Sequence, residues 1–362
     1  MTLQQKQWIV LNKENNFDGV VCVDAPVPVV GDSEVLVKIC AASLNYRDLV
    51  IPKGRYPLAL KLPVVPGSDG AGEVVEVGSK VTQFKKGDHV TTLFNQHHQY
   101  GPVNIHDTGY TLGGAIDGTL REYGVFDQNG LVKSPRNLTH IESSILTCAG
   151  LTSWNALYGL RPLLPGQTVL VQGTGGVSIF ALQFAKAAGA TVIATTSSPK
   201  KAEKLKSLGA DHVINYKISP NWGDIARGLT PDNVGVDYII EVGGAGTLSE
   251  SLKCIRFEGI ISIIGFLGSA DPRGQPCVLE ALHKICIIRG VLVGSKALMQ
   301  DMIRAIESND IHPVVDSVVF TLDKAKDAYK HMVRFSLLQN WAFMVTERLM
   351  NSGRRSISEK SR

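Results

Sequence analysis

The chain has 362 residues, which at about 150 residues per domain favours two domains over one. Lysine and arginine number 37 and aspartate and glutamate 33, so the net charge is +4. That charge is too small to indicate a nucleic-acid groove or an anionic membrane surface as a partner. Hydrophobic residues make up 44% and charged residues 19%, which excludes a disordered chain and allows a sizeable core.

The sequence shows no targeting or cross-linking signal. It has no uninterrupted apolar run of about 18 residues, so we expect no membrane span, and residues 1–6 lead into no signal-peptide core. We therefore expect a cytoplasmic protein. The cysteines form no Cys-x-x-Cys pair, which indicates neither a disulfide framework nor a zinc knuckle. They are Cys22, Cys40, Cys148, Cys254, Cys277 and Cys286.

The first 130 residues are typical of a β-rich domain. Short β-branched segments at 35–39, 64–66, 73–77 and 89–93 are separated by glycine and proline turns. Many short strands with such punctuation predict a small barrel or sandwich.

From about residue 150 strands and helices alternate. Apolar, β-branched segments predict strands at 168–172, 191–195, 236–242, 259–265 and 285–293. Helical spacing predicts helices at 177–188, 200–208 and 248–255. Continuously apolar strands that alternate with helices indicate an α/β fold with a doubly wound parallel sheet, covered on both faces.

After Gly294 the pattern is mixed. We predict a helix at 297–307, a strand at 314–321 and a helix at 323–333, followed by a polar, basic tail at 351–362. This part has the β-rich character of the first block, so we expect it to rejoin the first domain.

A glycine-rich turn follows the strand at 168–172 and opens the next helix. It reads Gly173-Thr-Gly175-Gly176-Val177-Ser178. Because a pyrophosphate must approach backbone N–H groups at a helix N-terminus, no Cβ can intervene there. Ser178 replaces the third glycine of the usual fingerprint, and a small residue is the mildest change at that packing position. The strand–turn–helix context predicts a dinucleotide site.

The end of the next strand indicates which dinucleotide binds. An NAD site needs an acidic residue about 20 residues after the glycines, but residues 195–201 carry hydroxyls and lysines instead. A carboxylate would repel a 2′-phosphate, whereas Ser197 and Lys201 can bind one. We therefore predict NADPH rather than NADH as the cofactor. The alternative for the two lysines at 200 and 201 is a solvated helix start.

Five segments together resemble the medium-chain dehydrogenase/reductase superfamily. They lie at 66–78, 84–90, 149–157, 209–216 and 264–267, and the resemblance runs in order from about residue 20 to about residue 335. It implies a discontinuous GroES-like catalytic domain at 1–149 and 295–362. It also implies an inserted Rossmann NADP-binding domain at 150–294, with a substrate cleft between the two.

Zinc-dependent members of that superfamily place metal ligands at three points. These points read Asn45, Ser68 and Ala149 here, with Cys148 one residue away from the expected position. No open three-ligand zinc site can be built from Asn, Ser and Ala. The structural zinc lobe needs four close cysteines, and residues 94–126 contain none. The chain therefore resembles the zinc-independent, quinone-oxidoreductase-like branch, and we expect no metal.

The resemblance also implies roles for individual residues. Tyr56 is proposed as the proton donor, or as a hydrogen-bond donor to the acceptor carbonyl; the alternative is a cleft-lining aromatic while solvent protonates. Asn45 is placed near the nicotinamide, Tyr46 lines the substrate cleft, and Thr152 lies at the hinge near the cofactor. The apolar character of Phe94 indicates that it lines the same cleft.

Further cofactor contacts follow from the same resemblance. They are Tyr216 beside the adenosine phosphate and, at strand ends, Gly265, Phe266, Leu267, Leu292 and Val293, with ordinary core packing as the alternative for the last two. Members of the superfamily usually finish with a Gly-Lys pair whose lysine reaches the cofactor. The matching segment, 338–346, lacks that lysine, so this contact is lost or the C-terminus is atypical.

The sequence thus predicts a zinc-independent, NADPH-dependent oxidoreductase. Its hydride acceptor is an activated C=C bond (enone or enal) or a quinone in a lipophilic small molecule. The alternatives are an alcohol/aldehyde dehydrogenase-reductase and a catalytically quiet nucleotide-binding protein. The apolar strand at 285–293 ends its sheet, and in this superfamily that edge pairs with its symmetry mate, so a homodimer is expected.

Overall fold

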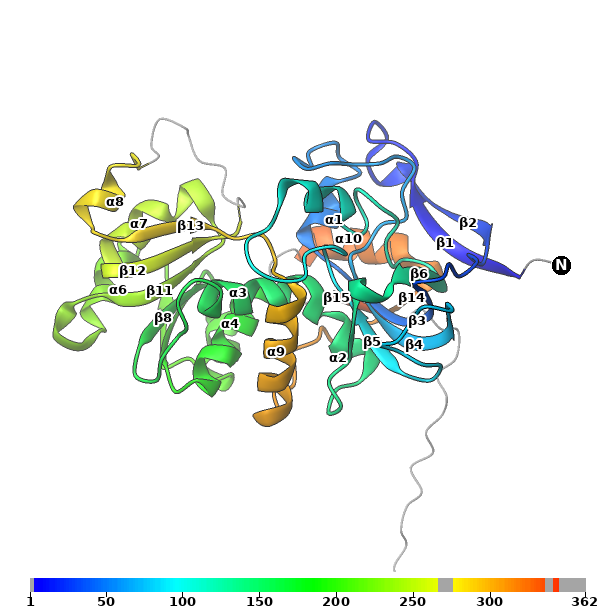
Figure 1. Cartoon of the computed structure of the whole chain (residues 1–362). Coiled ribbons are helices and arrows are strands. Elements are labelled where there is room, and N and C mark those ends of the chain that lie inside the picture. Colours follow the sequence, from blue (N-terminus) through cyan, green and yellow to red (C-terminus); the bar gives the residue numbers. More distant parts are fainter. Residues whose placement is uncertain (1–2, 266–275, 336–340, 345–362) are drawn as a thin grey trace, which may run out of the picture.

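The computed structural model of the chain describes residues 3–265, 276–335 and 341–344 (Figure 1). Two lobes lie side by side. One, at the left of Figure 1, is built on a six-stranded sheet, and the other, at the right, on a seven-stranded sheet. Helix α9 (Lys296–Ser308) lies between them.

The six-stranded sheet is parallel throughout and has the strand order β10–β9–β8–β11–β12–β13. Its strands are β8 (Thr168–Gln172), β9 (Thr191–Thr196), β10 (His212–Asn215), β11 (Val236–Glu241), β12 (Ile255–Ile263) and β13 (Ile287–Gly290). The helices of this lobe are α4 (Gly176–Ala187), α5 (Pro199–Ser207), α6 (Trp222–Gly228), α7 (Leu248–Cys254) and α8 (Glu280–His283).

Both faces of this sheet are buried, which explains its continuously apolar strands. All five residues of β8 are buried. Val169 and Val171 pack in one core with Phe180 of α4, whereas Leu170 packs in a second core with Trp222 of α6. Helices therefore cover both faces, and the predicted doubly wound α/β fold is confirmed.

The second lobe holds a seven-stranded sheet with the order β14–β15–β3–β4–β5–β7, and β6 also pairs with β3. Its strands are β3 (Glu34–Leu44), β4 (Asp69–Val77), β5 (His89–Thr92), β6 (Tyr123–Asp127), β7 (Leu131–Lys133), β14 (Phe320–Thr321) and β15 (Trp341–Met344). A separate antiparallel pair joins β1 (Gln4–Val10) and β2 (Val20–Pro26). The helices are α1 (Tyr46–Val50), α2 (His140–Ser144) and α10 (Ala325–Phe335), whereas α3 (Leu151–Tyr158) packs against α4 in the core of the six-stranded lobe.

The chain returns to this lobe after the six-stranded sheet. Tyr329 and Met332 of α10 pack in the same core as Val35 and Ile39 of β3. The indole nitrogen of Trp8 donates to the carbonyl of Leu322 at 2.7 Å. Strand β15 pairs with β3, so both ends of the described chain contribute to the β-rich lobe. The domain boundaries at 149/150 and 294/295 stay a prediction.

Three predicted strands are shorter in the structure. Residues 64–66 form only a single bridge from Val64 to Val10, because the N–H of Val65 donates to Asp117 and Pro66 has none. The strand predicted at 285–293 is confined to β13, since Ile285 and Val293 have φ angles of 45° and 46° that a β-strand does not allow.

The strand predicted at 314–321 is also mostly wrong. Phe320 and Thr321 pair as β14, and Val315 forms an isolated bridge. The carboxylate of Asp316 accepts a hydrogen bond from the backbone N–H of Val318 at 2.7 Å, which is the local turn that keeps aspartate out of strands.

None of the helices in the described part of the chain is long and apolar enough to cross a membrane.

Candidate active site

The glycine-rich turn after β8 leaves its backbone open. Gly173 has a φ of 74°, which only glycine adopts without strain. A Cβ added at Gly173 or Gly175 would meet no atom within 4 Å, so a ligand can reach this backbone directly. Gly176 and Val177 then form the first turn of α4, where backbone N–H groups attract phosphate. The residues present fit a dinucleotide pyrophosphate.

The side chain of Ser178 holds this turn against the end of β8. Its buried hydroxyl donates to the carbonyl of Gln172 at 2.7 Å, so the residue at the third glycine position ties the helix to the end of β8. The neighbouring carbonyl of Val177 accepts from the hydroxyl of Ser153 in α3, also at 2.7 Å. The turn is therefore held both by its own strand and by α3.

The residues predicted for the 2′-phosphate end lie at one edge of the sheet. The backbone N–H of Tyr216 donates to the carbonyl of Thr196 at 3.0 Å, which brings the ends of β10 and β9 together beside Ser197. Lys201 lies in the first turn of α5, where partial burial lowers its pKa. None of residues 195–201 is acidic. The structure thus gathers Ser197, Lys201 and Tyr216.

The remaining predicted cofactor residues divide into three groups. Gly265 packs so closely that an added Cβ would lie 2.4 Å from the carbonyl oxygen of Val242. Val293 packs in the hydrophobic core, whereas Leu292 is exposed and not part of that core. Phe266 and Leu267 lie outside the described residues.

Glu241, which the sequence did not single out, is a buried carboxylate that connects two loops at the carboxyl ends of β8 and β11. Glu241, at the end of β11, accepts from Gln172 Nε2 at 2.7 Å and from Ser251 Oγ at 2.6 Å. It also accepts from the backbone N–H groups of Gly243 at 3.0 Å and Gly244 at 2.9 Å. The glycine-rich turn and the loop after β11 are therefore fixed to each other.

A second group of side chains gathers around the N-terminus of α1. We call it the catalytic cluster: Asn45, Arg47, Asp48, Tyr56, Asp69, Phe94 and Cys148. The backbone N–H of Asn45 donates to Asp48 Oδ2 at 2.8 Å, which caps α1. Burial raises the pKa of the Asp48 carboxyl, while the neighbouring Arg47 opposes that rise.

Asp69 lies at the centre of this cluster and had no signal in the sequence. Its carboxylate is fully buried and accepts from Ser68 Oγ at 2.6 Å, from Ser43 Oγ at 3.2 Å and from the backbone N–H of Cys148 at 3.1 Å. Burial raises its pKa to about 6, although these hydrogen bonds oppose the shift.

The structure corrects the register at positions 148 and 149. The sequence comparison put Ala149 at the third ligand point and Cys148 beside it. In the structure Ala149 packs in the hydrophobic core, and Cys148 is the residue that faces Asp69 and Arg47. Burial, followed by the charge of Asp69, raises the pKa of the Cys148 thiol well above its usual value.

Arg47 is buried beneath two aromatic rings. Its side chain donates to the carbonyl of Leu112 at 2.5 Å, and its guanidinium carbon lies 5.0 Å from the ring centre of Tyr56 and 4.7 Å from that of Phe94. Burial raises the pKa of the Tyr56 phenol, and the charge of Arg47 lowers it. Tyr46, which was also predicted to line the cleft, is more exposed than Tyr56.

The side chains in the cluster do not fit a catalytic zinc ion. Zinc needs thiolate, imidazole or carboxylate ligands in a tetrahedral set. Here Asn45 and Ser68 offer an amide and a hydroxyl, Ser68 is hydrogen-bonded to Asp69, and burial raises the pKa of the Cys148 thiol, which disfavours a thiolate ligand. In the described part of the chain no three His, Cys, Asp or Glu side chains are grouped to hold an ion.

One short segment joins the catalytic cluster to the dinucleotide turn. Cys148 faces Asp69, and Ser153 Oγ lies 2.7 Å from both Ala149 O and Val177 O, which share its one hydroxyl proton. Thr152, predicted at the hinge, lies buried between these contacts. The structure thus places the two groups of predicted residues at opposite ends of residues 148–153.

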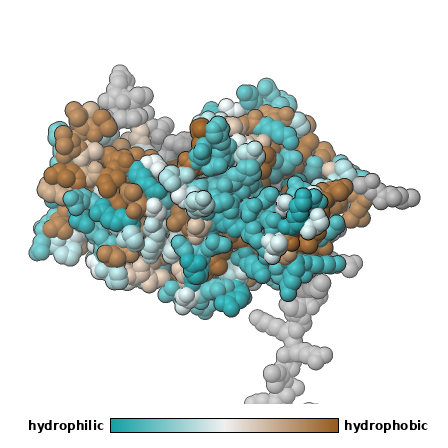
Figure 2. All heavy atoms as spheres, in the orientation of Figure 1, coloured by the Kyte–Doolittle hydropathy of each residue, from teal (hydrophilic) through white to brown (hydrophobic). Residues whose placement is uncertain are grey.

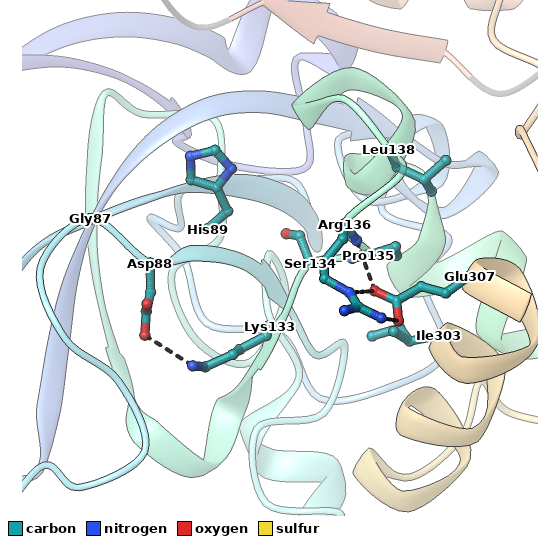
Figure 3. Close-up of a pocket in the computed structure, with 10 residues that line it drawn as sticks. All are labelled: Gly87, Asp88, His89, Lys133, Ser134, Pro135, Arg136, Leu138, Ile303 and Glu307. Carbon is teal, nitrogen blue, oxygen red and sulfur yellow. Dashed lines mark hydrogen bonds and ion pairs between the residues drawn. The ribbon is translucent and has the colours of Figure 1, made fainter. Parts of the chain in front are cut away.

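A separate cavity of about 590 Å³ lies between the loops flanking β5 and β7 and helix α9 (Figure 3). Its charged groups are paired with each other. Arg136 and Glu307 share two side-chain hydrogen bonds, and Lys133 lies 3.4 Å from the carboxylate of Asp88. No predicted site residue lines it, so we do not assign the reaction to this cavity.

Comparison with known proteins identifies the family. One family model, an alcohol dehydrogenase GroES-like domain, matches residues 31–136, and a second, a zinc-binding dehydrogenase, matches residues 176–308. A zinc-type alcohol dehydrogenase-like protein of Schizosaccharomyces pombe is 46% identical over 330 residues, which is 90% of this chain and 95% of that protein. The chain belongs to the medium-chain dehydrogenase/reductase superfamily.

Other members of the superfamily carry several activities in their names. The crystal structure of an alcohol dehydrogenase from Sinorhizobium meliloti has a TM-score of 0.86 and 36% identity, covering 95% of this chain and 99% of that one. A 2-methylene-furan-3-one reductase of Solanum lycopersicum is 32% identical over 84% of this chain and 70% of that protein. Further relatives are named NAD-dependent alcohol dehydrogenases.

The superfamily assignment confirms the resemblance seen in the sequence. The β-rich lobe is the predicted GroES-like domain, and the six-stranded lobe has the predicted Rossmann-like architecture. This chain is therefore an alcohol dehydrogenase-like, nicotinamide nucleotide-dependent oxidoreductase.

Proposed function

We propose that this protein is a zinc-independent, NADPH-dependent reductase. Its substrate is a lipophilic small molecule with an activated C=C bond (an enone or enal) or a quinone. The observation that carries the proposal is Tyr56 beside the buried Arg47, in a cluster whose side chains do not supply zinc ligands. The similarity to a reductase of Solanum lycopersicum supports the same class of reaction.

Each part of the site has a task in this reaction. NADPH, when bound, supplies the hydride. The open turn at Gly173 and Gly175 binds its pyrophosphate, and Ser197 and Lys201 bind its 2′-phosphate. Tyr56 Oη gives a proton to the reduced substrate, and Phe94 keeps water from the cluster. The buried Asp69 and Asp48 hold Cys148 and α1 in place.

The proposed preference for NADPH rests on the absence of an acidic residue at 195–201. Replacing Lys201 by Ala should raise the Kd for NADPH about 10-fold or more, because one charge-assisted hydrogen bond is worth roughly 1.5–3 kcal/mol. The Kd for NADH should not change. Fluorescence titration of both nucleotides checks this, and equal effects on the two would contradict the preference.

Alcohol or aldehyde chemistry is the second candidate, and the names of several relatives favour it. The test that separates the two uses chelator-treated protein, NADPH and an α,β-unsaturated aldehyde, with products identified by NMR. A saturated aldehyde supports C=C reduction. An allylic alcohol contradicts the proposal and favours the alcohol dehydrogenase activity.

A third outcome is NADPH binding without turnover of any enone, enal, quinone or aldehyde. That result would favour the catalytically quiet nucleotide-binding protein. The panel should include quinones of increasing size, because the proposed substrate is lipophilic and a narrow site can reject the smallest acceptors.

A further inference from the structure

Several buried polar atoms of the catalytic cluster lack hydrogen-bond partners. Among the described residues these include two nitrogen donors of one side chain near the start of α1, Arg47 Nε and Arg47 Nη2. A buried donor without an acceptor is costly, so native proteins rarely leave one in place. Neither of these nitrogens can accept a hydrogen bond, and the group that would satisfy them is an acceptor oxygen.

The guanidinium group of Arg47 is also a buried charge. Arg47 is 8% exposed, and its side chain is enclosed by Tyr56, Phe94 and the carbonyl of Leu112. Burial lowers its pKa, but Tyr56 and Asp48 outweigh that effect, so the pKa of Arg47 lies above the usual value and the group remains cationic. A Cβ at Gly114 would lie 2.6 Å from Arg47 Nη2, so the chain leaves room there for this group.

We propose that Arg47 provides the positive charge that stabilises the oxygen on which negative charge develops during reduction. This inference rests on the proposed function and explains how such a reaction proceeds with the side chains present. It adds electrostatic stabilisation by Arg47 to the proton donation proposed for Tyr56.

The chemistry balances without a further reagent. The hydride from NADPH forms a C–H bond at the β-carbon of an enone, and the C=C electron pair shifts to make an enolate. The charge of that enolate lies on the oxygen near Arg47. A proton from Tyr56, replaced from solvent, completes the saturated ketone, and NADPH becomes NADP⁺.

The proposal defines the substrate class. The acceptor must place negative charge on an oxygen, so enones, enals and quinones qualify and an isolated alkene does not. The titratable groups near Tyr56 and Arg47 are Asp48 on α1, Cys148 before α3 and Tyr329 on α10, and Asp69 accepts from the backbone N–H of Cys148. Of these only the guanidinium group is positive.

The test compares Arg47→Met and Arg47→Lys with a matched control, Arg121→Met. Arg121 is equally buried, lies 5.5 Å from the ring centre of Phe126 and has an unpartnered Nε, but it is outside the catalytic cluster. We expect Arg47→Met to lower kcat for an enone about 100-fold with an unchanged Kd for NADPH. Arg47→Lys should recover part of the loss, and Arg121→Met should keep kcat within about threefold.

Two further measurements separate this role from a structural one. Without the cation the pKa of Tyr56 rises further, so the alkaline limb of the kcat profile should move to higher pH in Arg47→Met. The second measurement is the absorbance of 4-nitrophenol in the NADP⁺ complex. The wild-type site should lower the pKa of the bound phenol, Arg47→Lys should do so less, and Arg47→Met not at all.

The outcomes distinguish the two proposals. If wild-type protein reduces enones but Arg47→Met keeps its kcat, or loses no more than Arg121→Met, the role of Arg47 is wrong and the proposed function stands. If wild-type protein reduces no acceptor while binding of 4-nitrophenolate depends on Arg47, the oxyanion site stands and the proposed reaction fails. Binding of nitrophenolate that is independent of Arg47 contradicts the inference in either case.

Discussion

At the scale of single residues, the hydroxyl of Tyr56 is the proposed proton donor. Tyr56→Phe removes one oxygen and leaves the ring over Arg47, so packing is kept. We expect kcat for an enone to fall roughly 100-fold, within the range for loss of a general acid, while the Kd for NADPH stays the same. Steady-state kinetics and nucleotide titration measure both quantities.

Tyr238→Phe is the matched control for that change. Tyr238 is a buried tyrosine of β11 whose hydroxyl donates to the carbonyl of Arg161 at 2.9 Å. Its loss should lower the free energy of unfolding by about 1 kcal/mol and leave kcat unchanged. Full turnover by Tyr56→Phe would assign protonation to solvent.

Asp69 makes stability depend on pH. Its folded-state pKa of about 6 exceeds the usual value of 3.8, so between about pH 4 and pH 6 the folded protein holds a proton that the unfolded chain has lost. This contribution therefore falls as pH rises through that window, by about 3 kcal/mol in total. Asp69→Asn removes it.

Urea unfolding at about pH 4.5, within the titration window, and about pH 7, above it, for wild type and Asp69→Asn, measures the effect. Relative to wild type, the Asn variant should gain stability on going from the lower to the higher pH. Parallel pH dependence of the two proteins would show that the Asp69 carboxyl titrates normally.

At the scale of elements, Glu241 holds the loop after β11 against the glycine-rich turn. In Glu241→Gln one acceptor oxygen becomes a donor, which leaves backbone and side-chain donors at Gly243, Gly244 or Ser251 without a partner. We expect the free energy of unfolding to fall by about 2 kcal/mol and the Kd for NADPH to rise about 10-fold.

Asp237→Asn provides the comparison, because Asp237 binds backbone and side chains at the opposite end of the same strand. It accepts from Thr168 N at 2.8 Å and from Gln167 Nε2 at 3.1 Å. This variant should lose similar stability without a change in the Kd for NADPH. Equal nucleotide affinity in both variants would limit Glu241 to a purely structural role.

Elements with a complete local pattern could be predicted from the sequence. Residues 168–172 are β8 itself, and the predicted helix at 177–188 differs from α4 by one residue at each end. Elements that end at an unusual backbone angle could not be predicted. Nothing in the amino-acid sequence of 285–293 indicates that Ile285 and Val293 adopt positive φ angles. Tertiary contacts decide those angles.

The candidate site likewise contains residues that could be predicted from the sequence and residues that could not. Gly173 and Gly175 follow from a local spacing that has a physical reason. Asp69, Arg47 and Glu241 come from three different elements. Their importance depends on burial and on distant partners, such as Cys148 for Asp69 at a separation of 79 residues and Gln172 for Glu241 at a separation of 69. A single sequence carries no signal of that kind.

At the scale of the whole molecule, the six-stranded lobe ends in an apolar edge that pairs with no further strand in the described part of the chain. Strand β13 is the last strand of its sheet. Exposed hydrophobic side chains lie on and beside it, and Figure 2 shows them gathered where α8 lies. They are Val278, Leu279, Leu282, Ile285 and Ile287. An edge of this composition promotes pairing with another chain, so we propose that a second copy covers it and forms a homodimer.

Charge placed on this edge should therefore break the dimer. Leu282→Glu combined with Ile285→Glu introduces two carboxylates at side chains that are 70% and 54% exposed, so the folded monomer tolerates them. Light scattering at micromolar concentration should give a dimer mass for wild type and a monomer mass for the double variant. Val29→Glu, at an 87% exposed position in the other lobe, should remain dimeric. A monomer mass for the wild-type protein would contradict the proposed dimer. It would mean that this apolar edge is open to solvent.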